Sequence, residues 1–487
     1  MISMHKGFIE RNETNDIKVR VLEGIAKIEK DHELDKLSID KIVEKIAQAD
    51  VLSDSLVTMF GVVSTSYAYF KHISKRATIE KLEELTEHSS YVVQCYAFAA
   101  LTQKAPDKLF KIIKSKLHIT KKIKTVYFDI LGRVRVADFF IYEGLPFLTA
   151  EQYNYIVDEV LEHNYDLDFK SNYFLELKPD EKNYERIRKF VIEFNDPYAL
   201  VALAKFQKDS DIEIIKSFSK GDSWQFYEAV KIFPHPSFWN LLLKIYNMGL
   251  EAEETYRPNI DYLYKAISVY HNVEAKEVLT NSFDKIKNQD FVKSHAEAIF
   301  RAIKTFKDGF YDKLLFKLWK DYNLINLEIF DYLWDKNSDL CLEIINISLN
   351  DPNKLSKIFW NSSFYGNIGT SIDESEEFAA KIIKLFIAKD KKNAFKAIKK
   401  NILYQNVSYL PIFTKIVSDL LEDDFIEVLF ERFSNDKNYD VYCDIAKCLL
   451  EYNSPEINKK LLKIIKNKSY LQKSWELREI LNKKAVK

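Results

Sequence analysis

The segment Ala105–Leu117, APDKLFKIIKSKL, decides how the rest of the chain is interpreted, because its apolar residues recur at the spacing of an amphipathic helix. On a helical wheel the apolar side carries Leu109, Phe110, Ile112, Ile113 and Leu117. The opposite side carries Lys104, Lys108 and Lys111. Pro106 suits the first turn, where the N–H that proline lacks would have no helical partner.

The stretch just before it, residues 91–101 (YVVQCYAFAAL), is apolar nearly all round, which is typical of a helix buried between neighbours. The two segments together predict a helical hairpin. The same order recurs with polar turns near residues 235, 272, 308 and 337, which are 37, 36 and 29 residues apart. A recurrence of roughly 30–45 residues indicates stacked helical repeats. The sequence therefore predicts an all-α fold, an α-solenoid of stacked antiparallel helix pairs.

Several of these segments share small details. Val93-Gln94 precedes Ala97, Ala100 and Leu101, whereas Asp211-Ile212 and Pro455-Glu456-Ile457 open second helices. In these details about half of the chain resembles HEAT-type repeats, including the short repeats of the phycobilisome-lyase type. The Asp-Pro and Val-Arg pairs typical of that family occur only in isolation, as Asp196-Pro197 and Val134-Arg135. The resemblance implies a HEAT-like superhelix and no specific activity.

The amino-acid composition argues against other fold classes. Only 10 of the 487 residues are glycine and 10 are proline, far below the usual roughly 7% and 5%. An all-β chain of this length needs more glycine for its turns, and nucleotide-binding α/β folds need it where backbone approaches phosphate. The 72 basic and 73 acidic residues nearly cancel, so a net charge of −1 gives no overall attraction to nucleic acid or anionic membrane.

The same sequence features predict the domain organisation of the chain and its cellular compartment. We expect helical repeats over residues 1–162 and 184–487 in one continuous array, with residues 163–183 as a soft joint. Residues 360–377 hold two glycines and little periodicity, which indicates a loop that ends where Asp373 or Ser375 caps the next helix. No stretch reaches the roughly 20 apolar residues of a membrane span, and no signal peptide is apparent. The four cysteines suit buried thiols in a reducing compartment, so we expect a cytoplasmic protein.

Motifs for catalysis and for cofactors are missing from the sequence. Gly366–Thr370 has two glycines but no lysine, so it is a poor phosphate loop. The nine histidines are at least 16 residues apart, which excludes a zinc pair on one helix turn. His295-Ala296-Glu297 matches half of a deaminase motif, but no Cys-x-x-Cys follows. We therefore expect no catalytic residue, no metal and no cofactor.

Charge is segregated along the chain. Residues 103–125 hold eight lysines and one acid, and residues 381–400 hold eight lysines and one acid. As basic-patch candidates we single out Lys104, Lys108, Lys111, Lys391, Lys392, Lys399 and Lys400. A functional interpretation is a surface that steers a charged partner, even a phosphate backbone. The simpler interpretation, which we favour, is that these lysines form the solvated faces of amphipathic helices, since nucleic-acid readers prefer arginine.

Aromatic residues cluster in or beside predicted connections. Large aromatics dominate interface hot spots, although most of these rings will serve the core between repeats. Our candidates for partner contact are Trp224, Tyr227, Phe359, Trp360, Phe364 and Tyr365.

Three functions remain open on this basis. The favoured one is a non-catalytic scaffold or adaptor that docks a protein partner on its helical surface, for example a bacterial immunity protein that wraps a toxin. The second is a nucleic-acid-binding repeat protein that uses its lysine-rich faces. The third is an enzyme on a helical scaffold, which requires acidic and aromatic residues to converge in a pocket.

Overall fold

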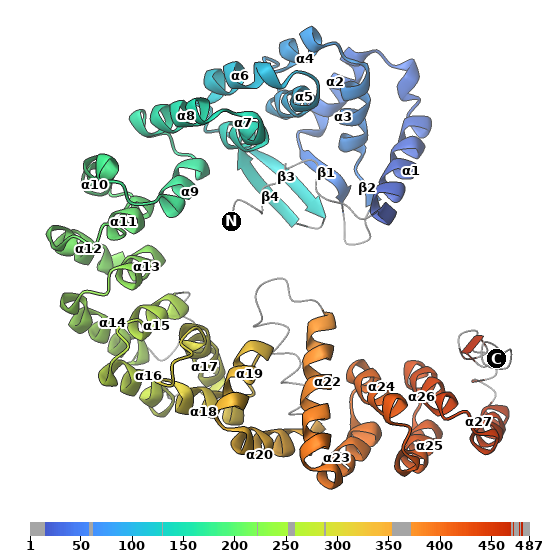
Figure 1. Ribbon diagram of the computed structural model, residues 1–487. Coiled ribbons are helices and arrows are strands. Elements are labelled where there is room, and N and C mark those ends of the chain that lie inside the picture. Colours follow the sequence, from blue (N-terminus) through green and yellow to red (C-terminus); the bar gives the residue numbers. More distant parts are fainter. Residues whose placement is uncertain are drawn as a thin grey trace. The chain divides into compact units, whose positions relative to one another are not determined.

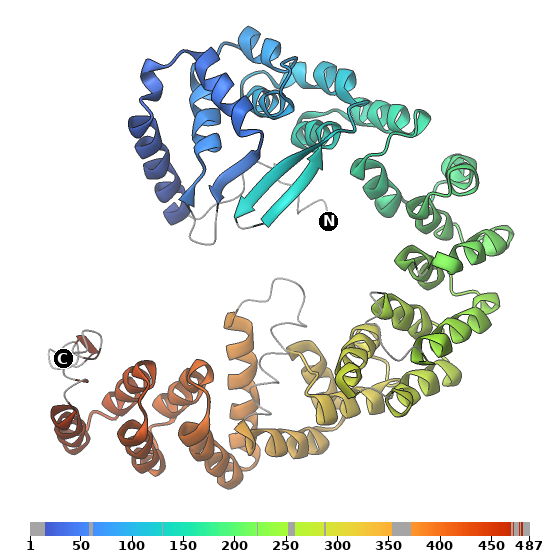
Figure 2. The same ribbon diagram turned by 180° about the vertical axis from the view of Figure 1, so that it is seen from behind.

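The computed structural model describes residues 15–57, 62–128, 130–221, 223–251, 259–286, 289–352, 372–468, 471, 477 and 479–480 (Figures 1 and 2). The chain divides into two compact units, Met1–Ile215 and Lys216–Lys487. Helices dominate both units, as the sequence predicts.

The first unit combines helices with one small sheet. Its helices are α1 (Asn15–Asp31), α2 (Ile39–Ala49), α3 (Thr65–Arg76), α4 (Ile79–Leu85), α5 (Tyr91–Lys104), α6 (Leu109–Lys116), α7 (Val136–Gly144), α8 (Ala150–Glu162), α9 (Asp168–Glu176), α10 (Glu181–Phe194) and α11 (Pro197–Ala204). Helix α12 (Ile212–Ser217) lies at the boundary between the units. The strands are β1 (Leu52–Val57), β2 (Val62–Val63), β3 (Lys122–Phe128) and β4 (Ile130–Arg135).

The predicted hairpin around residue 105 is confirmed. Helix α5 begins after the N-cap Ser90, whose side chain accepts the N–H of Val93, and is buried from Val92 to Leu101. It packs against α2, α3, α4 and α7. Pro106 opens a single 3-10 turn that leads into α6. The all-round apolar character of α5 therefore follows from its place among four other helices.

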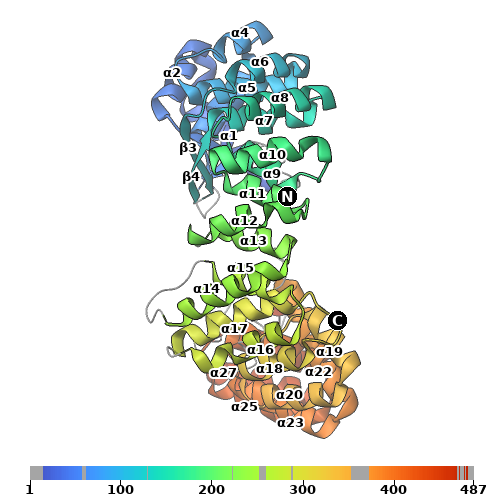
Figure 3. The ribbon, with the colours of Figure 1, turned by 90° about the vertical axis from the view of Figure 1, so that its left-hand side faces the viewer.

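The sheet was not predicted from the sequence. Its strand order is β2-β1-β3-β4, with β1 and β3 parallel and the other two pairs antiparallel. Figure 3 shows β3 and β4 at one margin of the first unit. The prediction that all lysines of residues 103–125 lie on helix faces is wrong, because α6 ends at Lys116 and β3 begins at Lys122. From there the alternation of lysine with Ile123 and Thr125 has the period of a strand.

Residues 163–183 lie inside the first unit and contain helix α9, which packs against α7, α8 and α11. Asp138 of α7 caps α9, since its carboxylate accepts the N–H groups of Asp168 and Phe169 at 2.9 and 2.8 Å. Arg135 donates to Asp166 and Asp168 at 2.8 and 2.7 Å. Burial raises the pKa of Asp138 to about 6, and the two backbone donors partly oppose that rise.

The second unit consists of helices in the part that the structure describes. They are α13 (Trp224–Ile232), α14 (Trp239–Glu251), α15 (Ile260–Ser268), α16 (Val273–Lys285), α17 (Gln289–Ile303), α18 (Asp312–Tyr322), α19 (Leu327–Lys336), α20 (Ser338–Leu349), α22 (Ile372–Lys389), α23 (Lys391–Tyr404), α24 (Leu410–Leu420), α25 (Ile426–Asn435), α26 (Tyr439–Glu451) and α27 (Pro455–Asn467). The helices end and restart at each of the turns predicted near residues 235, 272, 308 and 337.

Helices of the second unit contact both the next helix and the next but one. One series of contacts joins α13, α15 and α17, another joins α22, α24 and α26, and a third joins α20, α23 and α25. This is the contact pattern of stacked helix pairs. The superhelical, HEAT-like arrangement of the whole chain stays a prediction.

Tyrosines connect successive turns of the second unit. The hydroxyl of Tyr270 donates to the carbonyl of His235 at 2.8 Å, and Tyr311 donates to Ser268 at 3.0 Å. Tyr452 donates to the carbonyl of Glu422 at 2.8 Å. Burial raises the pKa of all three phenols, which therefore stay protonated and able to donate.

Two further expectations can be compared with the structure. All four cysteines are buried free thiols, as predicted. Across the described residues, no helix has the length and apolarity to cross a membrane.

Candidate partner-binding groove

A groove lies between α22 and α24, two neighbouring helices that both pack on α23. Its volume is about 310 Å³. Helix α22 contributes Glu377, Ala380 and Lys384, and α24 contributes Ile412, Lys415, Ile416 and Asp419. Each set recurs every three or four residues, so one face of each helix lines the groove.

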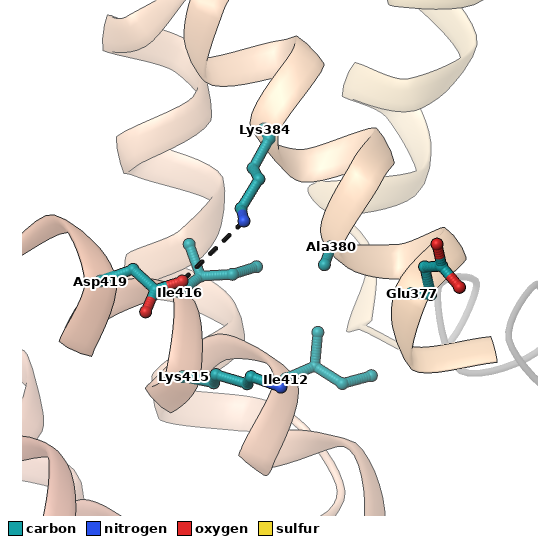
Figure 4. Close-up of a pocket in the computed structure, with 7 residues that line it drawn as sticks. All are labelled: Glu377, Ala380, Lys384, Ile412, Lys415, Ile416 and Asp419. Atoms are coloured by element: carbon teal, nitrogen blue, oxygen red, sulfur yellow. Dashed lines mark ion pairs between the residues drawn. The ribbon is translucent and has the colours of Figure 1, made fainter. Parts of the chain in front are cut away.

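Apolar side chains form the floor of this groove, and charged side chains form its rim (Figure 4). Ile412 and Ile416 are buried, and the small Ala380 leaves space above them. Lys384 and Asp419 approach to 3.9 Å across the groove, with both side chains about 60% exposed. An ion pair so exposed contributes little stability, on the order of 0–1 kcal/mol, so a partner can separate it at small cost.

Local sequence fixes the start and end of α24, and a long-range hydrogen bond anchors α23, on which both groove helices pack. Asn406 caps a 3-10 turn, and Pro411 then occupies the first turn of α24. Leu421 ends α24 with a left-handed backbone conformation (φ 51°). In α23, the buried Asn401 donates to the carbonyl of Leu349 at 2.7 Å and so anchors α23 to the end of α20.

A second hollow, of about 500 Å³, lies on α14 and α16. Its lining mixes the half-buried Trp239 with Leu243 and Val278, beside the exposed acids Glu274 and Glu277. The ring of Trp239 packs against Tyr270 at 5.0 Å between centroids. The lining of this hollow is more polar than apolar, whereas the lining of the α22–α24 groove is more apolar, so the groove is the better candidate for a partner's side chains.

Most of the predicted basic-patch lysines have partners within the chain. Lys108 pairs with Glu83 at 2.7 Å, Lys391 with Glu422 at 2.7 Å and Lys399 with Asp424 at 3.0 Å.

Two others donate to backbone carbonyls, Lys104 to Ala77 and Lys400 to Asn350. Lys111 and Lys392 are exposed. Five of the seven candidates therefore have a partner within the chain.

The aromatic candidates separate into two groups. Trp224 is half-buried and packs on Tyr262, with 5.5 Å between ring centroids. Tyr227 is 1% exposed, so the prediction that it contacts a partner is not supported, because α13 turns this ring into the core. The other four candidates, Phe359, Trp360, Phe364 and Tyr365, lie outside the described residues.

The groove was missed in the sequence analysis for a physical reason. The sequence shows the helical spacing of the lining residues within α22 and within α24. Which faces of the two helices meet, however, is decided by their packing on α23. Ala380 is a small residue on a helix face that also carries Glu377 and Lys384, but nothing else in the local sequence marks a groove.

The described residues also limit the chemistry that this fold can perform. Among them no group of three or more His, Cys, Asp or Glu is placed to hold a metal ion. His295 of the partial deaminase motif shares a hydrogen bond of 2.6 Å with the hydroxyl of Tyr264. Burial raises the pKa of Cys341 to about 12 and that of Cys448 to about 11, which keeps both as thiols.

The chain was also compared with known proteins. No protein-family model matches it and no curated protein matches it in sequence, so the HEAT-like resemblance of its repeats stays a prediction.

Proposed function

We propose that this protein is a non-catalytic scaffold that docks a protein partner, and that the groove between α22 and α24 contributes part of the docking surface. The observation that carries the proposal is the groove's apolar floor with a rim of two cations and two anions. Protein interfaces combine an apolar centre with a polar rim in the same way.

The composition of the groove indicates which segment would fit. Ala380, Ile412 and Ile416 offer a floor for apolar side chains, whereas Glu377 and Lys415 offer one charge of each sign. An amphipathic segment with apolar anchors flanked by both acidic and basic residues satisfies all of these groups. Recognition of this kind places anchors at i, i+3 and i+4 of a partner helix.

A photo-crosslinking experiment tests the proposal. A photoreactive amino acid is placed at Ala380 in the groove, and in a control protein at the exposed Lys392 on α23. Both proteins are exposed to light in cells of the native host and purified after nuclease treatment. We expect a discrete protein adduct from position 380 that is absent from position 392.

A substitution in the same groove gives a second readout. Ala380→Arg fills the space above Ile412 and Ile416 with a bulky cation, so it should reduce recovery of that partner by at least about tenfold. Lys392→Glu should leave recovery unchanged. Equal adducts from both positions, or full recovery with Ala380→Arg, would show that the groove is not the docking surface.

Nucleic-acid binding is the weaker alternative. It requires free cations on a common face, whereas five of the seven candidate lysines are bound within the chain. Loss of every adduct on nuclease treatment would favour it.

A further inference from the structure

Among the strands that the structure describes, none pairs with β4 on the side away from β3, so the β3–β4 hairpin has an open edge there. The strand order places β4 last in the sheet. Val136 donates to the carbonyl of Lys121 just beyond the strands, and the register pairs Ile123 with Val134 and Tyr127 with Ile130. Hydrogen-bonded and non-bonded pairs alternate in an antiparallel ladder, so the N–H and C=O groups of Leu131 and Arg133 point away from β3.

The side chains at this edge are unusual for an exposed strand. Leu131 is 82% exposed and Ile130 is 63% exposed. Proteins ordinarily protect a sheet edge with inward-pointing charge, proline or a covering helix, because an apolar open edge pairs with other strands. Here both apolar residues are exposed, beside strand groups that pair with no other described strand.

Like charges face each other across the hairpin. The register sets Lys124 opposite Arg133 and Lys122 opposite Arg135, and all four share one face of the sheet. Arg135 is neutralised by Asp166 and Asp168. Lys124 and Arg133 are exposed and have no acidic partner among the described residues. Directly opposed like charges destabilise a hairpin, so an anionic group placed between them would relieve repulsion.

We propose that β4 binds an extended, acidic segment of a protein partner by strand addition. The partner strand pairs its backbone with the outward groups of Leu131 and Arg133, and its acidic side chains lie on the face of Lys124 and Arg133. Its apolar side chains alternate with the acidic ones, so they lie on the opposite face of the sheet and contact Ile130. This proposal is independent of the α22–α24 groove, because every residue that carries it belongs to the first unit.

Other occupants fit these groups less well. A second copy of β4 would bring Arg133 and Lys124 of each copy toward each other and increase the repulsion. A nucleic acid would meet the cations but would leave the outward strand groups and Ile130 without a partner. Strand addition alone engages the edge, the apolar residues and the charge together.

Fluorescence anisotropy with the full chain tests the proposal. The probe is a labelled peptide in which Glu alternates with Val, matched in length to the six residues of β4. We expect saturable binding that weakens as salt is added, since screening shortens the reach of the cations. A peptide with Lys in place of Glu should not bind. Hydrogen exchange of residues 130–135 should slow when the acidic peptide is present.

Two matched pairs of variants locate the interaction. Arg133→Glu should weaken binding by about tenfold or more, whereas Lys111→Glu, the same reversal of charge at an exposed position of α6, should not. Leu131→Pro removes an outward N–H while leaving the hairpin's own bonds intact, and Leu131→Thr keeps that N–H. The proline variant should bind more weakly than the threonine variant, with circular dichroism confirming that both fold.

Several results would overturn the proposal. One is no binding of the acidic peptide at about 1 mM. Another is undiminished binding of a peptide that is N-methylated at alternate residues, because charge alone would then suffice. A third is displacement of the peptide by inorganic phosphate or a DNA duplex at equal affinity, which would assign the hairpin to phosphate instead.

Discussion

Replacing Asp138 by alanine tests how the first unit holds α9 in place. The Asp138 side chain is fully buried and accepts the N–H groups of Asp168 and Phe169 at the start of α9. The bond to Phe169 is buried, so its N–H would lose its partner without access to water. Leaving this N–H without a partner lowers the free energy of unfolding by about 1–3 kcal/mol. Loss of the capping bond to the partly buried N–H of Asp168 lowers it by about 1 kcal/mol more. We therefore expect Asp138→Ala to destabilise the first unit by about 2–4 kcal/mol.

Asp180→Ala is the matched control, because Asp180 also caps a helix, accepting the N–H of Lys182 at 3.1 Å, but is exposed. Its loss should cost about 0.5–1 kcal/mol. All six tryptophans lie at residue 224 or beyond, so tryptophan emission reports unfolding of the second unit, while far-ultraviolet circular dichroism reports both units.

The assay is urea unfolding followed by both signals, with hydrogen exchange of residues 166–176. In Asp138→Ala, the part of the circular dichroism signal that comes from the first unit should be lost at a lower urea concentration than in the unsubstituted protein. The urea midpoint of the tryptophan signal should not change, and hydrogen exchange in α9 should be faster. Equal destabilisation by Asp138→Ala and Asp180→Ala would refute the reasoning, since burial of the cap would then contribute nothing.

Four other outcomes are expected. Because the folded-state pKa of Asp138 is raised to about 6, above its usual 3.8, the folded state binds this proton more tightly than the unfolded state does. The part of the stability that this proton contributes is full below about pH 4 and lost as the pH rises through 6, and Asp138→Asn should remove that part of the pH dependence in urea titrations. Trp319 is 1% exposed and its indole N–H has no partner among the described residues. Trp319→Phe should therefore lower the stability of the second unit by less than about 1.5 kcal/mol, whereas Trp319→Ala should lower it by about 3–5 kcal/mol. Thermal unfolding of the second unit measures both. Gly144→Ala would place a methyl group 2.5 Å from Ile113, so it should destabilise the first unit by about 1–3 kcal/mol; a neutral result in urea unfolding would mean that Ile113 moves aside freely. Asn401→Ala leaves the carbonyl of Leu349 without its side-chain donor and should cost about 1–3 kcal/mol, with faster exchange at the end of α20.

Helical structure and the positions of the turns could be read from the sequence. The buried face of an amphipathic helix follows from the spacing of apolar residues within one segment, as in Leu109, Ile112 and Ile113 of α6. Turns are indicated by residues such as Pro236 and Asn337. The four cysteines were likewise correctly expected to be buried. These features are local, so local pattern suffices.

The sheet, the groove and the use of the lysines depend on residues far apart in the chain. Leu52 pairs with Thr125, which lies 73 residues further on, and no short window shows that pairing. Lys108 and Lys124 look alike in sequence, yet packing gives Lys108 the carboxylate of Glu83 and sets Lys124 opposite Arg133.

The sequence by itself determined the helical hairpins, because periodicity and capping act over a few residues. Only the tertiary structure decided which charges are neutralised and which remain exposed, because an ion pair forms wherever packing happens to bring two side chains within reach. The same holds for the groove of Ala380 and Ile416, whose two walls meet only after α22 and α24 have packed on α23.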